Sequence, residues 1–197
     1  REVPRGRRDR LPGTLTIRED RRLKMVTRRQ GREWALQLLV QFDLNPPLMA
    51  ENDIPVFWEL QTELEAEARA EGEGVKAVFT DADPRVQASL AEAKAFAEER
   101  VRGVLAERHA LDAKIELFLR NWALYRLGTV ERNVLRICAW ELIHCPDIPA
   151  PILVNEAVDL AKFFSETKSG KFVNGVLDKL AKDLRSPKAE TFTPPEA

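Results

Sequence analysis

Apolar residues recur at helical spacing along most of the chain, and this pattern limits what the chain can fold into. In residues 28–42, for example, Trp34, Leu38 and Phe42 lie four positions apart and therefore share one face of a helix. We find no segment with the alternating apolar and polar residues, or the turn signals, of a β-hairpin. The sequence therefore predicts an all-α fold, a bundle of about seven helices joined by short connections.

Prolines, glycines and capping residues divide the helical pattern into segments. The third segment is the best marked, because Asp83 can cap a helix whose first turn contains Pro84. Gly128 is a candidate C-cap for the fourth segment, and Thr129 is a candidate N-cap for the fifth. The predicted helices cover residues 28–42, 53 to about 72, 83–108, 111–127, 129–142, 152–164 and 172–184.

Charge is unevenly distributed along the chain. Residues 1–32 contain 12 Lys and Arg residues and 4 acidic residues, a local balance of +8, whereas the remaining residues carry −9. Arginine forks onto phosphate groups, so the basic segment points toward a phosphate-bearing partner; a solvated tail is the alternative. Residues 1–24 show no helical or strand period, and because Met25 stands just before the first helix they are either a true extension or a start-site artefact.

These observations predict a single helical domain with appendages. We expect a disordered basic extension at residues 1–24, the helical domain at 25–185 with a lengthened acidic connection at 45–82, and a disordered tail at 186–197. Glutamates dominate the stretch from Glu63 to Glu73. It is either a solvated extension of the second helix, which we favour, or an added surface for docking a protein.

Composition and motifs exclude several classes of protein. No apolar run approaches the roughly 18 residues of a membrane span, two cysteines cannot build a disulfide framework, and the charged start does not resemble a secretory signal, so we expect a cytosolic protein without a membrane partner. Neither a nucleophile motif nor a phosphate-binding glycine loop is present. Cys138, His144 and Cys145 lack the second ligand pair of a structural zinc site. We therefore predict no catalysis, no metal and no cofactor.

Two basic clusters are the candidate binding residues. Arg28, Arg29 and Arg32 are spaced i, i+1 and i+4 at the start of the first helix, so at least two of them can project from one side, beside the positive end of the helix dipole. Lys168, Lys171 and Phe172 lie at the opening of the last helix. Cations beside an aromatic ring suit single-stranded RNA, whose unstacked bases can lie on the ring. The alternatives are a solvated helix start for the arginines and a core position for Phe172.

Four segments of the second half carry a resemblance to a known family. They are Val130-Glu-Arg-Asn-Val-Leu-Arg-Ile-Cys-Ala-Trp-Glu-Leu142, Asp147-Ile-Pro149, Val154-Asn-Glu-Ala-Val-Asp-Leu-Ala-Lys162 and Lys171-Phe-Val-Asn-Gly-Val-Leu-Asp-Lys-Leu180. These segments resemble the NusB family of bacterial transcription antitermination factors. The opening helix of that family is similar to Arg28-Arg-Gln-Gly-Arg-Glu-Trp-Ala-Leu-Gln37.

The resemblance implies a seven-helix fold and a function without catalysis. Members of the family bind single-stranded boxA RNA from ribosomal leader transcripts together with the ribosomal protein NusE, and they join the elongating RNA polymerase complex. The RNA-binding positions implied are Arg28, Arg29, Arg32, Arg136, Lys171 and Phe172, and the basic cluster itself adds Lys168. The family's surface for its protein partner lies around the fourth to sixth helices, which suggests Glu131 as a contact for NusE.

The chain also departs from the family pattern. Val40 replaces a frequent aromatic residue, and Lys168 and Gly170 stand where an acidic residue and a histidine are common. A protein-only scaffold or homodimer with weakened RNA binding is therefore an alternative function. An enzyme is a third, because similar helical domains precede RNA cytosine methyltransferase domains, but this sequence contains no glycine-rich βαβ unit. Asn155, Glu156 and Asn174 are either ligand contacts or, as we favour, buried polar links between the last two helices.

Overall fold

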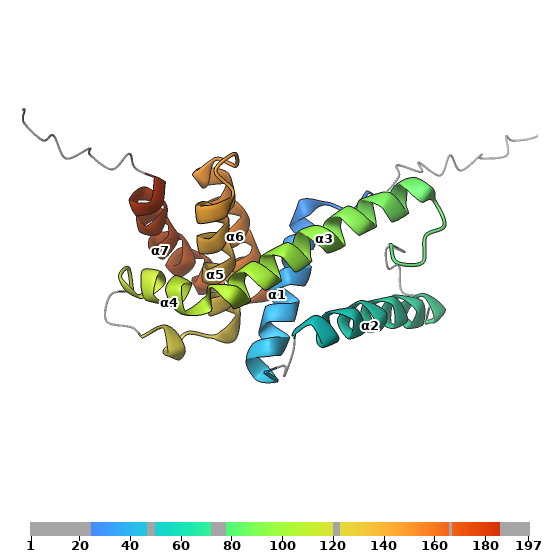
Figure 1. The fold of residues 1–197 in the computed structure, drawn as a ribbon. Helices are drawn as coiled ribbons and strands as arrows, with labels where there is room; N and C mark the ends of the chain where they lie inside the picture. Colours follow the sequence, from blue (N-terminus) through green and yellow to red (C-terminus); the bar gives the residue numbers. More distant parts are fainter. Residues whose placement is uncertain (1–24, 47–49, 72–77, 120–122, 166, 186–197) are drawn as a thin grey trace, which may run out of the picture.

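The structure is a computed structural model that describes residues 25–46, 50–71, 78–119, 123–165 and 167–185. These residues form seven α-helices and one 3₁₀ helix, and none of them lies in a strand, which confirms the predicted all-α fold (Figure 1). The helices are α1 (Arg28–Leu44), α2 (Ala50–Ala70), α3 (Pro84–Ala106), α4 (Arg108–Glu116), η1 (Leu124–Arg126), α5 (Thr129–His144), α6 (Ala150–Phe164) and α7 (Thr167–Arg185). Within the described residues, no helix is both long enough and apolar enough to cross a membrane.

Helix α5 lies at the centre of the packing. It contacts α1, α3, α4, α6 and α7. Leu135, Ile137 and Leu142 of α5 are almost completely inaccessible to solvent. Helices α4 to α7 cluster at one end of the molecule, the long helix α3 crosses α1, and α2 lies at the other end (Figure 1). The surroundings of α5 explain why its sequence is apolar on more than one face.

The first and third helices begin as their sequences predict. The N-cap Thr27 accepts a hydrogen bond from the backbone N–H of Gln30, and Asp83 accepts one from Arg85, with Pro84 in the first turn. The predicted stripe of α1 is buried throughout, since Trp34, Leu38 and Phe42 are each less than 5% exposed. Short-range capping and periodicity were therefore sufficient to locate these elements.

The predicted helix at 111–127 is wrong, because α4 ends at Glu116 and a separate 3₁₀ turn covers Leu124–Arg126. Leu119 and Leu124 are both buried, yet on one continuous helix they would point about 140° apart. Breaking the helix lets both side chains enter the core. The carboxylate of Glu116 accepts a hydrogen bond from the backbone N–H of Leu124, 3.2 Å away.

Gly128 and Thr129 also differ from expectation, since Gly128 is the N-cap of α5 and Thr129 its first residue.

The last helix begins at Thr167, five residues earlier than predicted, so Gly170 lies inside α7. This glycine is buried against α6, and a Cβ atom there would come within 2.8 Å of Cγ of Lys162. The position needs a residue without a side chain because α6 and α7 approach closely, and the glycine does not end a helix. Residues 72–77, 120–122 and both predicted disordered ends lie outside the described residues.

Helix α2 is attached to the rest of the fold mainly through its buried face. The Trp58 indole N–H donates to Glu98 of α3 at 2.8 Å, and its ring packs edge-on against Trp34 of α1 at 5.4 Å. Farther along, the buried Glu65 carboxylate accepts hydrogen bonds from the backbone N–H groups of Val78, Phe79 and Thr80. Burial alone would raise the pKa of Glu65, but these hydrogen bonds outweigh it and lower the pKa. The carboxylate thus ties α2 to the segment that precedes α3.

We expect Glu65→Gln to reduce the free energy of unfolding by about 2 kcal/mol at neutral pH, because an amide cannot satisfy all of these donors. Urea denaturation followed by circular dichroism measures the change. Glu71→Gln, at an exposed position directly after the same helix, is the matched control and should change stability little. Equal losses in the two variants would contradict this account of how α2 is anchored.

Candidate nucleic-acid interface

The first turn of α1 places Arg28 and Arg29 on the surface. Both are exposed, as the helical spacing predicts for two of the three arginines. Arg29 pairs with Glu33 one turn later at 3.3 Å and lies 3.7 Å from Asp159 of α6. Ion pairs at this level of exposure are weak and exchange readily, so the guanidinium of Arg29 is still available to a phosphate group.

Arg32 occupies a different environment, because it lies on the buried stripe of α1 and is only 5% exposed. Its Nε donates to both carboxylate oxygens of Glu141, at 3.1 and 3.0 Å. Arg100 of α3 donates to the same carboxylate at 2.7 Å. The structure therefore gives Arg32 an internal partner from α5, so Arg28 and Arg29 are the two of the three arginines that lie on the surface.

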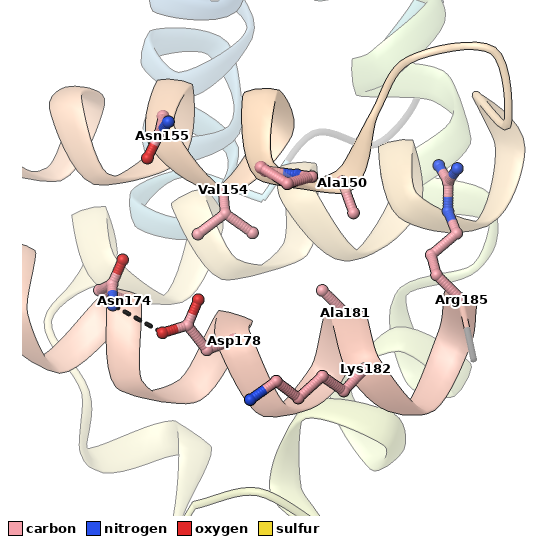
Figure 2. A pocket seen from close by; sticks show the side chains of 9 residues that line it. Ala150, Val154, Asn155, Asn174, Asp178, Ala181, Lys182 and Arg185 are labelled. Carbon is pink, nitrogen blue, oxygen red and sulfur yellow. Dashed lines mark hydrogen bonds between the residues drawn. The ribbon is translucent and has the colours of Figure 1, made fainter.

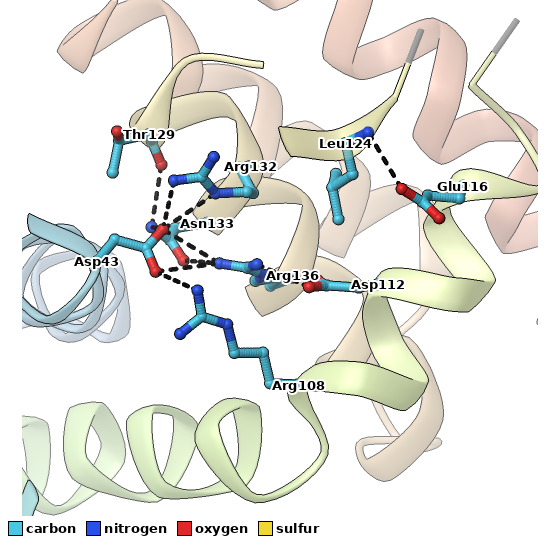
Figure 3. Close-up of polar contacts among 9 residues, drawn as sticks. All are labelled: Asp43, Arg108, Asp112, Glu116, Leu124, Thr129, Arg132, Asn133 and Arg136. Carbon is cyan, nitrogen blue, oxygen red and sulfur yellow. Dashed lines mark hydrogen bonds and ion pairs between the residues drawn. The ribbon is translucent and has the colours of Figure 1, made fainter. Parts of the chain in front are cut away.

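Arg136 is also buried, at the meeting point of α1, α4 and α5 (Figure 3). Its guanidinium forms two parallel hydrogen bonds with Asp112 at 2.7 and 2.8 Å, and it contacts Asp43 at 3.2 Å. Asp43 also accepts hydrogen bonds from Arg108 and Arg132. Burial by itself would raise the pKa of Asp43. The hydrogen bond from Arg132 and the charges of Arg136 and Arg108 outweigh that effect and lower the pKa, so the carboxylate stays charged. The cluster holds three helices together.

Glu131, the predicted contact for a protein partner, lies in the first turn of α5. Its carboxylate accepts hydrogen bonds from the hydroxyl groups of Ser165 and Ser169, at the junction of α6 and α7. Burial raises the pKa of Glu131, but these two hydroxyl groups outweigh that effect and lower it. The side chain is half-buried, so one carboxylate both fixes this junction and reaches the surface.

Lys171 and Phe172 lie next to each other in the second turn of α7. Lys171 is exposed, whereas Phe172 is half-buried and packs against the hydrophobic core. Part of the Phe172 ring is therefore used in the fold, as the core alternative predicted. The side chain of Lys168 lies outside the described residues.

Helix α6 brings the two predicted basic clusters together. Asp159 of α6 lies beside Arg29 of α1, and the side chain of Lys162 lies against Gly170 of α7, next to Lys171. Basic side chains from α1, α6 and α7 therefore lie along the surface of α6. We call the exposed residues Arg28, Arg29, Lys162, Phe163 and Lys171 together the α6 ridge; Arg28 lies at its α3 side, with its guanidinium 6.0 Å from the centre of the Phe96 ring.

Sequence reasoning missed two residues of the α6 ridge, Lys162 and Phe163. Phe163 is 68% exposed, and its ring packs edge-on against Phe164, which contacts the core. An exposed, supported ring next to a cation has the properties expected of a platform for stacking bases. The Lys162-Phe163 pair repeats the Lys171-Phe172 pair, and that repetition was the signal in the sequence.

Asn155, Glu156 and Asn174 are not the buried links that we favoured from the sequence. Asn155 is exposed, Glu156 is half-buried, and the Asn174 amide donates to Asp178 of its own helix at 2.8 Å. Asn155 and Asn174 face a shallow groove of about 440 Å³ between α6 and α7 (Figure 2). The apolar residues of both helices hold them together, so the asparagines are left at the surface.

Comparison with known proteins agrees with this architecture. The sequence model of the NusB family matches residues 29–182, which is most of the chain. The chain belongs to the NusB family. The transcription antitermination protein NusB of Myxococcus xanthus is 39% identical over 163 residues, covering 83% of this chain and 100% of that protein. NusB of Citrifermentans bemidjiense is 36% identical over 159 residues, covering 80% and 95%.

Solved NusB structures have the same fold. A structure of T. maritima NusB aligns with a TM-score of 0.60 at 28% identity, over 81% of this chain and 93% of that one. NusB in a crystal structure described as antitermination factors NusB and NusE in complex with dsRNA aligns with a TM-score of 0.56 at 27% identity, over 79% and 96%. The relatives therefore match nearly the whole helical domain of this NusB family member.

We expect Asp43→Asn to lower the free energy of unfolding by about 3 kcal/mol at neutral pH, because it leaves the buried Arg136 and its neighbours with one carboxylate fewer. The pKa of Asp43 is lower in the folded than in the unfolded protein, so this stabilisation is complete above about pH 4 to 5 and is lost as the pH falls through the folded-state pKa. Urea denaturation at a series of pH values measures the difference. Asp147→Asn, an exposed change of the same kind, is the control, and a pH-independent difference would contradict the assignment.

Proposed function

We propose that this chain is a transcription antitermination factor that binds boxA-type leader RNA together with NusE and joins the elongating RNA polymerase complex. The observation that carries the proposal is the match of residues 29–182 to the NusB family, whose members include a protein crystallised with NusE and RNA. In this proposal the chain acts in the cytoplasm by binding, without catalysis and without a cofactor.

We assign RNA binding to the α6 ridge. Arg28 and Arg29 add two side-chain cations to the positive end of the α1 dipole, an arrangement that attracts phosphate groups. Lys162 and Lys171 extend this charge across α6 to α7, and the exposed ring of Phe163 offers a surface to an unstacked base. The ridge thus combines charge for the phosphate backbone with a stacking platform.

We assign supporting roles to the buried cations. Arg32 holds α1 against α5 through Glu141, and Arg136 holds α5 against α1 and α4, so both orient the ridge from inside the fold. Phe172 supports Lys171 by packing on the core. Lys168 keeps its predicted role as a phosphate contact. This division places the direct RNA contacts on the exposed residues.

We assign the NusE contact to the surface around Glu131. The carboxylate is held by two hydroxyl groups, which prepares a fixed negative charge for a cationic group of the partner. A solved structure described as NusB and NusE in complex with dsRNA contains both kinds of partner. Glu131 adjoins the α6 ridge through Ser165 and Ser169, so RNA and NusE would bind side by side in this proposal.

The RNA assignment predicts that Arg28→Ala/Arg29→Ala weakens binding to a fluorescent boxA-like RNA by about tenfold at low salt. The slope of log affinity against log salt should become less steep by about 1.4, because two phosphate contacts with a single strand are lost. Arg85→Ala/Lys114→Ala removes two exposed cations from α3 and α4 and is the matched control. Fluorescence anisotropy with single-stranded and double-stranded RNA, with and without NusE, measures both quantities. NusE association without any RNA binding would instead favour the protein-only scaffold.

The NusE assignment predicts that Glu131→Lys weakens NusE binding at least about tenfold by isothermal titration calorimetry, because a partner cation then faces a like charge. Ser169→Ala removes one hydrogen bond to the carboxylate but keeps its charge, so this control should change NusE affinity much less. Equal effects of the two substitutions would mean that Glu131 acts only by holding the helix junction.

A further inference from the structure

Helix α2 carries an apolar stripe that nothing in the described part of the chain covers. Val56, Leu60 and Leu64 are 56%, 45% and 48% exposed. They lie four residues apart, so they form one line about 12 Å long on the side of the helix. The buried face of α2, with Ile54, Phe57 and Trp58, holds the helix on the fold. The stripe is therefore not needed for that attachment.

A row of carboxylates runs parallel to this stripe. Glu59, Glu63 and Glu67 are exposed and lie four residues apart. Glu59 and Glu63 each immediately precede a leucine of the stripe. Within the described residues none of the three forms an ion pair. We call the stripe and the row together the acidic face of α2. Its charge repels nucleic acid, and two copies packed through it would bring their glutamates together. The face fits a segment that is both apolar and basic.

Residues 1–24 of this chain have that composition. They contain nine Lys and Arg residues and four acidic residues. The part at residues 11–23 holds Leu11, Leu15, Ile17 and Leu23, with three of the arginines (Arg18, Arg21 and Arg22) and two of the acidic residues. The residues that follow this segment in the chain show where its C-terminal end joins the fold. Val26 donates its backbone N–H to Ser89 of α3 at 3.1 Å, and one turn later Gln30 shares a depression of about 230 Å³ with Leu64 and Glu65 of α2. The basic segment therefore leaves the fold near the Leu64 end of the stripe.

The length of the segment is sufficient to cover the stripe. An extended chain advances about 3.3 Å per residue, so four residues match the 12 Å from Leu64 to Val56, and residues 11–23 can reach well beyond it. Because the segment is covalently attached, its local concentration at the face is high, and weak contacts are enough to keep it bound. We propose that residues 11–23 dock on the acidic face of α2, with their leucines and isoleucine on the stripe and their arginines beside Glu59, Glu63 and Glu67.

The test uses the full chain with a photoreactive benzoylphenylalanine in place of Ile17, irradiated at low protein concentration and mapped by mass spectrometry. The proposal predicts crosslinks within one molecule to residues 56–67. Glu63→Gln/Glu67→Gln and, separately, Leu60→Ser/Leu64→Ser should each lower their yield at least fivefold. Asp147→Asn/Asp183→Asn removes the same charge from exposed positions elsewhere and should leave the yield unchanged.

Each alternative occupant gives a different result. Crosslinks between two molecules that disappear on dilution would assign the face to a second copy and overturn the proposal. Crosslinks at other positions, or none, would also overturn it, as would yields that the substitutions in α2 do not change. Circular dichroism of every variant shows that the helical domain is intact, so a lost crosslink reports on docking and not on folding.

Discussion

The fold depends on one buried carboxylate, that of Glu141. It is 1% exposed and accepts hydrogen bonds from Arg32 of α1 and Arg100 of α3, so that it joins three helices at the centre of the domain. A buried charge is strongly unfavourable unless it is paired, and here two guanidinium groups approach it from different helices. Any other register of α1 or α3 would leave at least one of these charges without a partner. The ion pairs therefore select one packing among those that the apolar stripes alone would allow.

This constraint determines which arginines of α1 are available to a ligand. With Arg32 turned inward to Glu141, the preceding turn presents Arg28 and Arg29 outward, Arg29 beside α6 and Arg28 beside Phe96 of α3. At the other end of α1, Asp43 gathers Arg108, Arg132 and Arg136, so Arg136, which the family resemblance implied as an RNA contact, forms ion pairs between helices. The cations of the α6 ridge are basic residues of this region that are left on the surface.

Much of the fold followed from local patterns. The capping of α3 by Asp83 and the buried stripe of α1 were predicted because each depends on residues a few positions apart. The predictions failed where distant packing decides the outcome. The helix expected at 111–127 is broken so that Leu119 and Leu124 can both be buried, and Gly170 lies within α7 because α6 approaches it. No property of those short segments reveals the neighbour that causes either change.

The sequence by itself determined the helical class, most helix positions, the uneven charge and the resemblance to the NusB family, since all of these lie in spacing and residue type. Only the tertiary structure decided the environment of each basic residue. Arg32 and Glu141 are separated by 109 positions, and Arg136 and Asp43 by 93. Helical spacing shows which residues share a face, but whether protein or water covers that face depends on where distant helices pack. For the same reason, only the structure showed that Phe163 and the stripe on α2 are exposed.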